Sequence, residues 1–374
     1  MTNKKKQQTR LEKIRGKVTW QNTRKALAVI SAVLYLLAVI TLAVVKFVPA
    51  KYLLVIVPIS ALGMVVLLRA QFTKKASVLK NTVLITLSLL IGVVSVGAFS
   101  TLMSLSSFVA DIQAEDAKEV AVTKPFIVYV SGIDTYGEID TVSRSDVNML
   151  IVVNPQTNRV LLVNTPRDYY VQLHGTTGDK DKLTHAGTYG IEMSRKTLED
   201  LYGVPIDAYV RVNFSSLVAI IDALGGVDVY SDYDFKEFHT GYNRVNGEQA
   251  LEFARERYSF SEGDRQRGKN QQHVIEAIIT KMNDPKNMLN YRKILNATAG
   301  AVQTNMGGDS LAKLVNHQLD TMHPWKVTSI SVDGTGAMLP TYSAGAQPLY
   351  VMVPDEQTVD VAKKAIADTW KVEP

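Results

Sequence analysis

Three long apolar runs near the N-terminus limit what this 374-residue chain can fold into. The runs Ala26–Val45, Tyr52–Leu68 and Asn81–Ala110 contain 20, 17 and 30 residues without a charged side chain. A helix needs about 20 predominantly apolar residues to cross the hydrocarbon core of a bilayer. The second run, which contains Pro58, is the marginal one. We therefore expect a three-helix transmembrane region over residues 26–110.

The distribution of basic residues predicts how these helices are oriented. Residues 1–25 form a leader with nine Lys and Arg against one Glu and almost no apolar periodicity. The loop after the first run carries two lysines, and the loop after the second run carries four basic residues. Positive charge stays on the cytoplasmic side of a membrane. We expect a disordered or interfacial leader inside the cell, three spans of the cell membrane, and an extracellular chain from about Asp111 onward.

The remainder of the chain has the opposite charge balance. Residues 125–374 hold 24 Lys and Arg against 31 Asp and Glu, although the whole chain has a formal charge of +5. This argues against nucleic acid as a partner, because nucleic acid is bound through clustered basic residues. The chain has no cysteine, so a domain outside the cell has to be stable without disulfides. We interpret residues 111–124 as a linker and residues 125–374 as one extracellular domain.

Strand-like and helix-like segments alternate in this domain without a regular βαβ repeat. Apolar, β-rich runs occupy residues 126–134, 147–154, 160–166, 227–231, 327–332 and 349–353. Helical patterns occupy residues 189–202, 214–224, 247–254, 273–282, 286–302 and 356–369. The turn at residues 155–158 predicts that the second and third runs pair as a hairpin inside a sheet. We expect an α/β fold with a mixed central β-sheet flanked by helices.

The stretch Arg255–Gln271 is rich in basic side chains and follows an amphipathic helical pattern. On a continuous helix, Arg255 and Arg257 would diverge by roughly 200°. If both contact one ligand, the helix has to end between them and the chain has to become extended. Several guanidinium groups from such a loop suit a phosphate, since each planar group binds two oxygens. Taken alone, the stretch also fits a solvated surface with local ion pairs.

Charged residues also lie at the ends of three predicted strands. Asp134 ends the first strand, Arg144 and Asp146 precede the second, and Arg167 follows the third. Because the second and third strands pair, we expect Arg144, Asp146 and Arg167 to share one rim of the sheet. Carboxylates hold hard cations and arginines hold phosphate oxygens, so the mixture predicts a metal–pyrophosphate site. Singly, each residue also fits a helix cap, a turn or a surface ion pair.

Six motifs occur in a fixed order along the domain: SGID, TVSRSDVNMLIVVNPQTNRVLLVNTPRD, DKLTHAGTYG, DALGGVDV, NGEQALEFARERY and GDRQRGKNQQHVI. On these motifs the chain resembles the LytR–CpsA–Psr family of Gram-positive envelope proteins over about residues 125–285. The three predicted spans are most similar to those of capsule-type members. The resemblance implies an extracellular catalytic domain with this family's fold.

The resemblance also implies an activity. Family members are phosphotransferases that move a glycopolymer, such as capsular polysaccharide or a wall teichoic-acid-like polymer, from an undecaprenyl-pyrophosphate carrier to peptidoglycan. Mg²⁺ or Mn²⁺ is the implied cofactor, and the prenyl tail is expected in an apolar tunnel between sheet and helices. The implied partners are the lipid-linked polymer, peptidoglycan, the membrane and capsule assembly proteins.

Site residues follow from the resemblance by matching motif positions. The implied metal ligands are Asp134 and Asp146, and these two acids with Arg255 and Arg257 are the implied catalytic residues. The residues expected to bind the pyrophosphate are Arg144, Arg167, Arg255, Arg257, Arg267 and Gln271. Asp264 and Lys182 occupy further motif positions. Asn270 departs from the family, where many members have Arg, and Arg265 and Lys269 match no motif position.

Two other functions remain open at this point. A pyrophosphatase acting on the lipid carrier would use the same residues with water as the nucleophile. A non-catalytic regulator of capsule assembly would bind the lipid carrier and would tolerate loss of the paired acids and arginines. The general base is also open, because Asp134 or Asp146 could take the acceptor proton but a metal ligand is a poor base.

Overall fold

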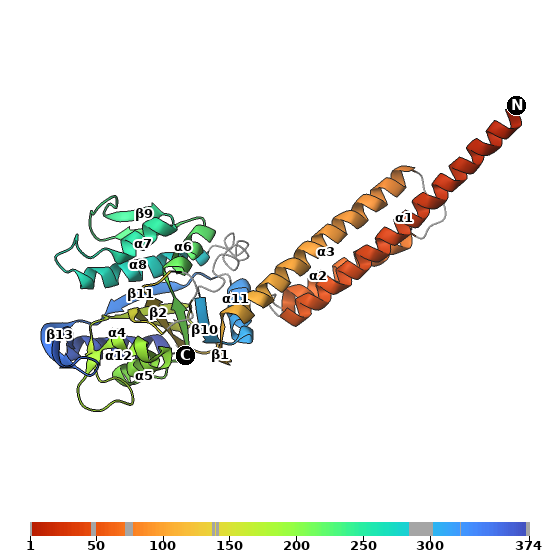
Figure 1. The fold of residues 1–374 in the computed structure, drawn as a ribbon. Coiled ribbons are helices and arrows are strands. Elements are labelled where there is room, and N and C mark those ends of the chain that lie inside the picture. The colour runs from red at the N-terminus through yellow and green to blue at the C-terminus, as the bar shows by residue number, and fades with distance from the viewer. Residues whose placement is uncertain are drawn as a thin grey trace. The chain divides into compact units, whose positions relative to one another are not determined.

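The computed structural model describes residues 2–45, 50–71, 78–136, 139, 142–283, 302–321 and 323–371. The chain forms two compact units, Met1–Ser106 and Ser107–Pro374, which are treated separately below. Figure 1 shows the helices of the first unit and the layered sheet and helices of the second.

The N-terminal unit consists of long apolar helices. Its helices are α1 (Thr2–Val45), α2 (Ala50–Gln71) and α3 (Val78–Ile112), of which the last continues into the second unit. Each contains a segment long and apolar enough to cross a membrane: Asn22–Val44, Ala50–Gln71 and Leu79–Ser100. The three apolar helices expected from the sequence are therefore present. The leader, expected to be disordered or interfacial, is helical and continues into the apolar part of α1, since its Lys, Gln, Arg and Leu residues favour helix, so the disordered alternative is wrong.

Polar side chains connect the three helices of this unit. Arg24, which is almost fully buried, donates to the Gln71 carbonyl oxygen and to the Asn81 side chain. The Gln71 side chain in turn donates to Ser88 Oγ at 3.0 Å, and Ser31 donates to the Ser88 carbonyl oxygen at 2.7 Å. Interhelical hydrogen bonds of this kind satisfy polar groups in a setting where water is scarce, so they fix how the helices pack.

The described part of the second unit contains a seven-stranded mixed sheet in the order β1-β10-β7-β2-β3-β4-β11. The strands are β1 (Gln113–Lys118), β2 (Phe126–Ile133), β3 (Ser145–Asn154), β4 (Arg159–Thr165), β7 (Ala208–Val212), β10 (Val302–Met306) and β11 (Lys326–Ser331). β2 pairs antiparallel with β3 and parallel with β7, and β3 pairs antiparallel with β4. The predicted hairpin is therefore confirmed, with Asn148 opposite Thr165.

Helices cover both faces of this sheet (Figure 1), which confirms the predicted fold class. On one side lie α4 (Leu183–Ala186), η1 (Gly187–Tyr189), α5 (Ile191–Tyr202) and α12 (Glu356–Trp370). On the other side lie α6 (Phe214–Ala223), α7 (Gly247–Arg255) and α8 (Asp264–Met282). Strand β2 is buried along its whole length because alternate side chains enter both cores. Tyr129 packs in the core with α5 and α12, whereas Val130 packs in the core with α8.

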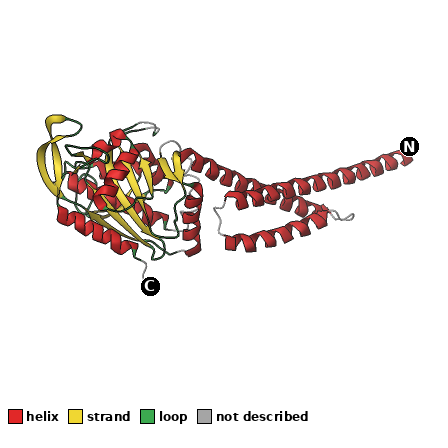
Figure 2. Cartoon of the chain, turned by 90° about the horizontal axis from the view of Figure 1, so that it is seen from below, coloured by secondary structure: helices red, strands yellow, loops and turns green. Residues whose placement is uncertain are grey.

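Three two-stranded ribbons and one more helix complete the described residues. The ribbons are β5–β6 (Tyr170–Val171, Asp181–Lys182), β8–β9 (Val227–Ser231, Gly241–Val245) and β12–β13 (Gly334–Thr341, Gly345–Pro354), and the helix is α11 (Gly308–Thr321). Figure 2 shows β12–β13 as a long hairpin at the edge of the unit.

The sequence prediction missed β1, β5–β7, β9, β10, β12, α4 and α11. In β12 the reason is composition, since its glycines and Pro340 weaken a strand signal. The helix expected near 286–302 lies outside the described residues except for Val302, which begins β10.

The helix before the arginine stretch ends where the sequence analysis required. The side chain of Asn246 caps the start of α7 by accepting from the Gln249 amide at 2.9 Å. Helix α7 ends at Arg255, and Glu256 has extended backbone angles of φ −65° and ψ 131°. The next helix, α8, begins at Asp264 and not at residue 273 as expected. Its first turns carry charged residues without apolar periodicity, which hid the helix in the sequence.

Glu256 holds the loop between α7 and α8. Its carboxylate accepts hydrogen bonds from the backbone amides of Arg257, Tyr258 and Ser259 at 2.7–3.0 Å. Lys236 Nζ lies 2.5 Å from the same carboxylate. Burial alone would raise the pKa of Glu256, but the hydrogen bonds from Lys236, Ser259 and Tyr258 outweigh it and lower the pKa to about 2. The loop that displays Arg257 is thus built around one buried negative charge.

Replacing this charge tests that role. The pKa of Glu256 in the folded protein lies below the ordinary value of 4.5. The ionised carboxylate therefore contributes fully to the free energy of unfolding above about pH 4.5, and this contribution is lost as the pH falls toward 2. We expect Glu256→Gln to lower the free energy of unfolding by about 1–3 kcal/mol at pH 7 and by less at pH 3. Urea unfolding of the full-length protein in detergent, followed by tryptophan fluorescence, measures both values.

The exposed Glu248, in the first turn of α7, provides the control, and Glu248→Gln should change stability little at either pH. An equal loss at pH 7 and pH 3 for Glu256→Gln would mean that the carboxylate charge does not hold the loop.

Candidate active site

A cavity of about 310 Å³ opens where the ends of β2, β3 and β4 meet α6, α7 and α8. Its apolar lining comes from the sheet and these helices and includes Val130, Ile133, Val147, Val212, Phe214, Leu217, Leu251, Val274 and Ile275. Its charged lining residues are Asp134, Asp146, Arg167, Arg255, Arg257 and Arg267, and its polar ones are Asn213, Tyr258 and Gln271. The six charged residues and Gln271 were predicted as site residues from the sequence, whereas Asn213 and Tyr258 were not.

The register of the sheet brings the strand-end residues together. Since β3 and β4 are antiparallel neighbours, Asp146 near the start of β3 lies beside Arg167 just after β4. Arg167 Nη1 donates to Asp146 Oδ1 at 2.7 Å. Burial would lower the pKa of Arg167, but this hydrogen bond and the charges of Asp264 and Asp168 raise it above its usual value. The guanidinium therefore stays charged at the cavity wall.

Asp264 is the carboxylate around which the arginines gather. Its side chain lies 2.7 Å from Arg267 Nη2, 3.8 Å from Arg167 Nε and 3.9 Å from Arg257 Nη1. Asp264, Arg267 and Gln271 follow one face of α8 at helical spacing. Burial lowers the pKa of Arg267, although Asp264 opposes this effect. Arg167 Nε and Asp264 Oδ1 are buried and make no aligned hydrogen bond among the described residues, although Arg267 Nη2 lies 2.7 Å from Asp264 Oδ1.

Arg255 and Arg257 reach the same cavity from the end of α7, as the sequence analysis required of a shared ligand. The guanidinium of Arg255 lies over the ring of Phe214 at 4.4 Å and its Nη2 is 3.9 Å from Asp134. Arg257 lies over the ring of Tyr258 at 4.6 Å. Aromatic faces attract guanidinium groups and orient them without neutralising their charge.

A second cavity of about 550 Å³ adjoins the first. It shares Arg167, Arg257 and Tyr258 with the first cavity, and its other lining residues are Asp168, Lys182, Phe260, Gly263, Asp264 and Tyr350. Lys182 Nζ lies 3.0 Å from Asp168 Oδ1, and both side chains are mostly buried. Lys182 and Asp264, the two additional motif positions, thus lie at this cavity. The contributions of Phe214, Tyr258 and Tyr350 were not predicted, because isolated aromatic residues give no spacing signal.

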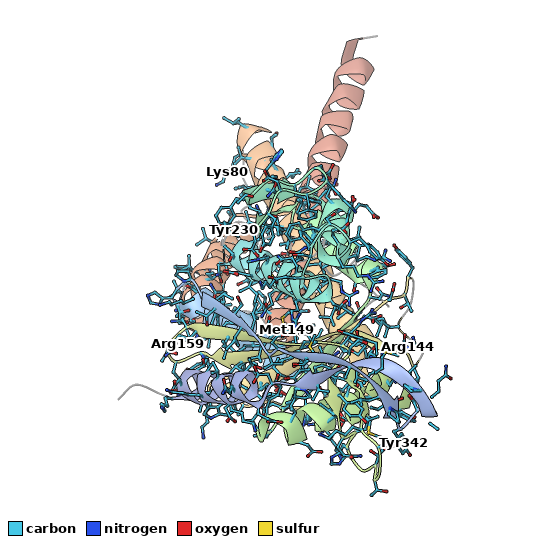
Figure 3. All side chains as sticks on the ribbon, turned by 90° about the vertical axis from the view of Figure 1, so that its left-hand side faces the viewer. Lys80, Arg144, Met149, Arg159, Tyr230 and Tyr342 are labelled. Carbon is cyan, nitrogen blue, oxygen red and sulfur yellow. The ribbon has the colours of Figure 1, made fainter. Side chains whose placement is uncertain are left out.

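Other residues of the sequence analysis lie elsewhere. Arg144 is exposed at the end of β3 opposite to Arg159 and lines neither cavity, as Figure 3 shows for these two side chains on either side of Met149. Its proposed role in pyrophosphate binding stays a prediction. Arg265 binds Asp333 at 2.6 Å, and Lys269 lies 3.3 Å from Glu262.

Asn270, where the sequence departs from the expected Arg, is buried inside the unit. Its side-chain amide donates to the Phe253 carbonyl oxygen at 3.1 Å and its Oδ1 accepts from Gln266 at 3.1 Å. The residue therefore ties α8 to α7 and does not face the cavities.

The carboxylates of the first cavity suit a metal ion whose coordination is completed by phosphate. Asp134 and Asp146 both line it, and Mg²⁺ is commonly held by one or two carboxylates together with substrate phosphates and water. Among the described residues, no group of three or more His, Asp or Glu side chains could hold a metal ion. The donor set therefore fits a cation that arrives with a phosphate ligand, and not a cage made by protein alone.

Comparison with known proteins agrees with this architecture. The model of the LytR_cpsA_psr family matches residues 99–366. The polyisoprenyl-teichoic acid–peptidoglycan teichoic acid transferase TagU of Bacillus cereus is 30% identical over 305 residues, which are 76% of this chain and 97% of the relative. Biofilm regulatory protein A of Streptococcus mutans is 31% identical over 288 residues, or 70% of each chain.

Solved structures show the same similarity. The crystal structure of TagV from B. subtilis has a TM-score of 0.56 and 29% sequence identity, and the match covers 67% of this chain and 99% of TagV. The family match spans the sheet, both helical layers and the cavity residues. This chain belongs to the LytR–CpsA–Psr family.

Proposed function

We propose that this protein is a transferase that moves a glycopolymer from a polyprenyl-pyrophosphate carrier to peptidoglycan. The observation that carries the proposal is the lining of the first cavity, which combines many apolar side chains with four arginines. A polyprenyl pyrophosphate has the same two parts, an apolar chain and a pyrophosphate with several negative charges. Relatives named as teichoic acid–peptidoglycan transferases support the same substrate class.

The arginines would act on the charge that develops during transfer. The acceptor hydroxyl oxygen forms a bond to the sugar-side phosphorus, the bond from that phosphorus to the bridging oxygen breaks, and polyprenyl phosphate leaves with the electron pair. Arg167, Arg255, Arg257 and Arg267 would hold the oxygens of the donor and of the leaving phosphate. Positioned guanidinium groups in a partly buried site stabilise such charge strongly, because they need not reorganise during the reaction.

The cation and the proton acceptor involve the same two acids. Asp134 and Asp146 would hold Mg²⁺ or Mn²⁺ together with the pyrophosphate oxygens, and the bound ion would supply further positive charge at the leaving group. Asp146 is engaged with Arg167, whereas Asp134 is more exposed and 3.9 Å from Arg255. Asp134 is therefore the more accessible of the two to an acceptor hydroxyl that has to lose its proton.

The apolar helices are consistent with a protein anchored in the membrane that contains the lipid carrier. The basic leader and loops support a cytoplasmic N-terminus and an extracellular catalytic unit, where peptidoglycan is available. Capsular polysaccharide is the polymer suggested by the capsule-type arrangement of spans, and teichoic acid is the polymer suggested by the names of the relatives.

Loss of one arginine should abolish most of the activity. We expect Arg257→Ala to reduce kcat/KM for transfer about 10³-fold, and Arg257→Lys to recover only part of it, because lysine cannot bind two phosphate oxygens through one planar group. The measurement uses full-length protein in detergent with saccharide-bearing polyprenyl pyrophosphate, Mg²⁺ and a peptidoglycan fragment. Both transferred polymer and released phosphate are quantified.

Lys269→Ala is the matched control, since Lys269 belongs to the same basic stretch but pairs with Glu262 away from the cavities. Phosphate release that persists without any transfer to the acceptor would assign a pyrophosphatase in place of a transferase. Lipid binding without either reaction, unaffected by Arg257→Ala, would assign the non-catalytic regulator.

Metal binding should depend on the donor and on Asp134. We expect Asp134→Asn to weaken Mn²⁺ binding about 10–100-fold when polyprenyl pyrophosphate is present. Electron paramagnetic resonance of bound Mn²⁺ measures this directly, without reference to turnover. Asp228→Asn, on the exposed side of β8, is the control and should leave Mn²⁺ binding unchanged. Unchanged Mn²⁺ affinity in Asp134→Asn would remove Asp134 from the metal site.

A further inference from the structure

The β8–β9 ribbon has one buried face and one exposed face, because successive side chains of a strand point to opposite sides. On the buried face, Val227, Val229 and Val245 pack in a core cluster with α6, α7 and α8. Figure 1 shows β9 beyond α7 and α8, on the side of these helices away from the sheet. The exposed face carries two cross-strand pairs, Asp228 with Arg244 and Tyr230 with Tyr242, and is called the tyrosine face below.

The two tyrosines of this face are in contact with water although each has a large apolar ring. Tyr242 is 79% exposed and Tyr230 is 39% exposed. Their ring centroids lie 5.4 Å apart at an interplanar angle of 75°, and the ring of His273 on α8 lies 5.7 Å from that of Tyr230. Tyrosine is common at binding surfaces because its ring is apolar and its hydroxyl can form hydrogen bonds. Tyr242 therefore offers an open ring that Tyr230 and His273 support.

The charged groups on and beside the tyrosine face are paired with one another. Arg244 donates to Asp228 Oδ2 at 2.9 Å, and His273 Nε2 lies 3.4 Å from Asp232 Oδ2. An anionic lipid headgroup or a polyanionic polymer is bound by an excess of basic side chains. These residues have no such excess, so the face suits an uncharged ligand that carries many hydroxyl groups.

The size of the tyrosine face distinguishes a saccharide from a protein partner. A tyrosine side chain buries about 150–250 Å² in an interface, so the two tyrosines supply roughly 300–500 Å². A stable protein–protein interface needs about 800 Å² on each partner. The apolar face of a pyranose ring packs against one tyrosine ring, and its hydroxyls can bind a carboxylate such as Asp228 and a guanidinium such as Arg244. A chain of sugars therefore fits this face better than a second copy of the protein does.

The segment that follows β8 connects the tyrosine face to the candidate active site. Tyr233 is 47% exposed, and its ring lies 5.9 Å from that of Phe260. Phe260 lines the second cavity together with Arg257. Asp232 accepts a hydrogen bond at 3.0 Å from Gln266, near the start of α8. A saccharide chain on the tyrosine face can therefore extend over Tyr233 toward the cavities.

We propose that the tyrosine face binds the uncharged glycan strand of the peptidoglycan acceptor, with Tyr242 as the residue that packs against a sugar ring. Asp228 and Arg244 bind sugar hydroxyls, and Tyr230 supports the ring of Tyr242. The inference rests on the proposed function, because that function takes peptidoglycan as the acceptor. It adds an acceptor site outside both cavities, which holds a long strand while one of its hydroxyls reaches the arginines.

The test separates binding of the acceptor from binding of the donor. Full-length protein in detergent is titrated with a short, peptide-free glycan fragment of peptidoglycan and, separately, with polyprenyl pyrophosphate. We expect Tyr242→Ala to raise Kd for the glycan about five- to tenfold and to leave Kd for the lipid within about twofold. Tyr242→Phe keeps the ring and should leave Kd for the glycan within about twofold. In the transfer assay, Tyr242→Ala should raise KM for the acceptor and leave kcat unchanged.

Tyr342→Ala is the matched control, because Tyr342 is an exposed tyrosine on another ribbon, β12–β13, and lines neither cavity (Figure 3 labels it and Tyr230). It should change neither affinity. Unchanged glycan binding in Tyr242→Ala would overturn the proposal, and so would an equal loss for both ligands. A dimer that dissociates on Tyr242→Ala, seen by light scattering, would assign the face to a second copy and overturn it as well. If the wild-type protein bound the glycan but transferred no polymer to peptidoglycan, the proposed function itself would fail instead.

Discussion

Clustering several positive charges at one cavity is the constraint on which this site depends. Arg167, Arg257 and Arg267 approach one carboxylate, Asp264, at 3.8, 3.9 and 2.7 Å. Without a nearby negative charge, such a group would repel itself and lose hydration on burial, which costs several kcal/mol for an unpaired buried ion. Asp134, Asp146 and Asp264 offset the repulsion only in part, because four arginines line the cavity. An anionic ligand would complete the balance, as the proposed function requires.

The backbone supplies the geometry that keeps these charges together. Asp146 and Arg167 meet because β3 and β4 pair in a fixed antiparallel register, and a shift by one residue would move both side chains to other faces. Arg255 and Arg257 can reach one cavity because α7 ends between them, and the buried carboxylate of Glu256 keeps the following loop in place. Helix α8 then adds Arg267 and Gln271 from one face. Strand ends, a helix end and a helix face thus converge on one cavity.

The sequence predicted the parts of this arrangement that follow local rules. The hairpin of β3 and β4 follows from apolar runs joined by a turn, and the proximity of Asp146 to Arg167 follows from the hairpin. The end of α7 followed from requiring Arg255 and Arg257 to share a ligand.

The remaining parts depend on contacts between distant segments. Tyr350 lies almost a hundred residues beyond Arg257, on a ribbon whose glycine- and proline-containing partner strand gives no clear pattern. Arg265 looked like a solvated residue because its partner, Asp333, is 68 positions away in the chain. Arg144 directly precedes β3 but lines neither cavity, so its role stays a prediction from the motif alone.

The order of the two cavities also constrains how transfer can proceed. If the proposed donor places its prenyl chain against the aliphatic residues of the first cavity, its lipid phosphate would lie nearer them and its sugar-side phosphate nearer the second cavity. In-line displacement requires the acceptor oxygen to approach the sugar-side phosphorus from the side opposite to the leaving lipid phosphate. In this proposal the acceptor would approach from the second cavity, which Tyr350 of the β12–β13 ribbon lines. The arginines shared by both cavities would then contact the pyrophosphate, which is the part of the proposed donor that does not depend on the polymer it carries.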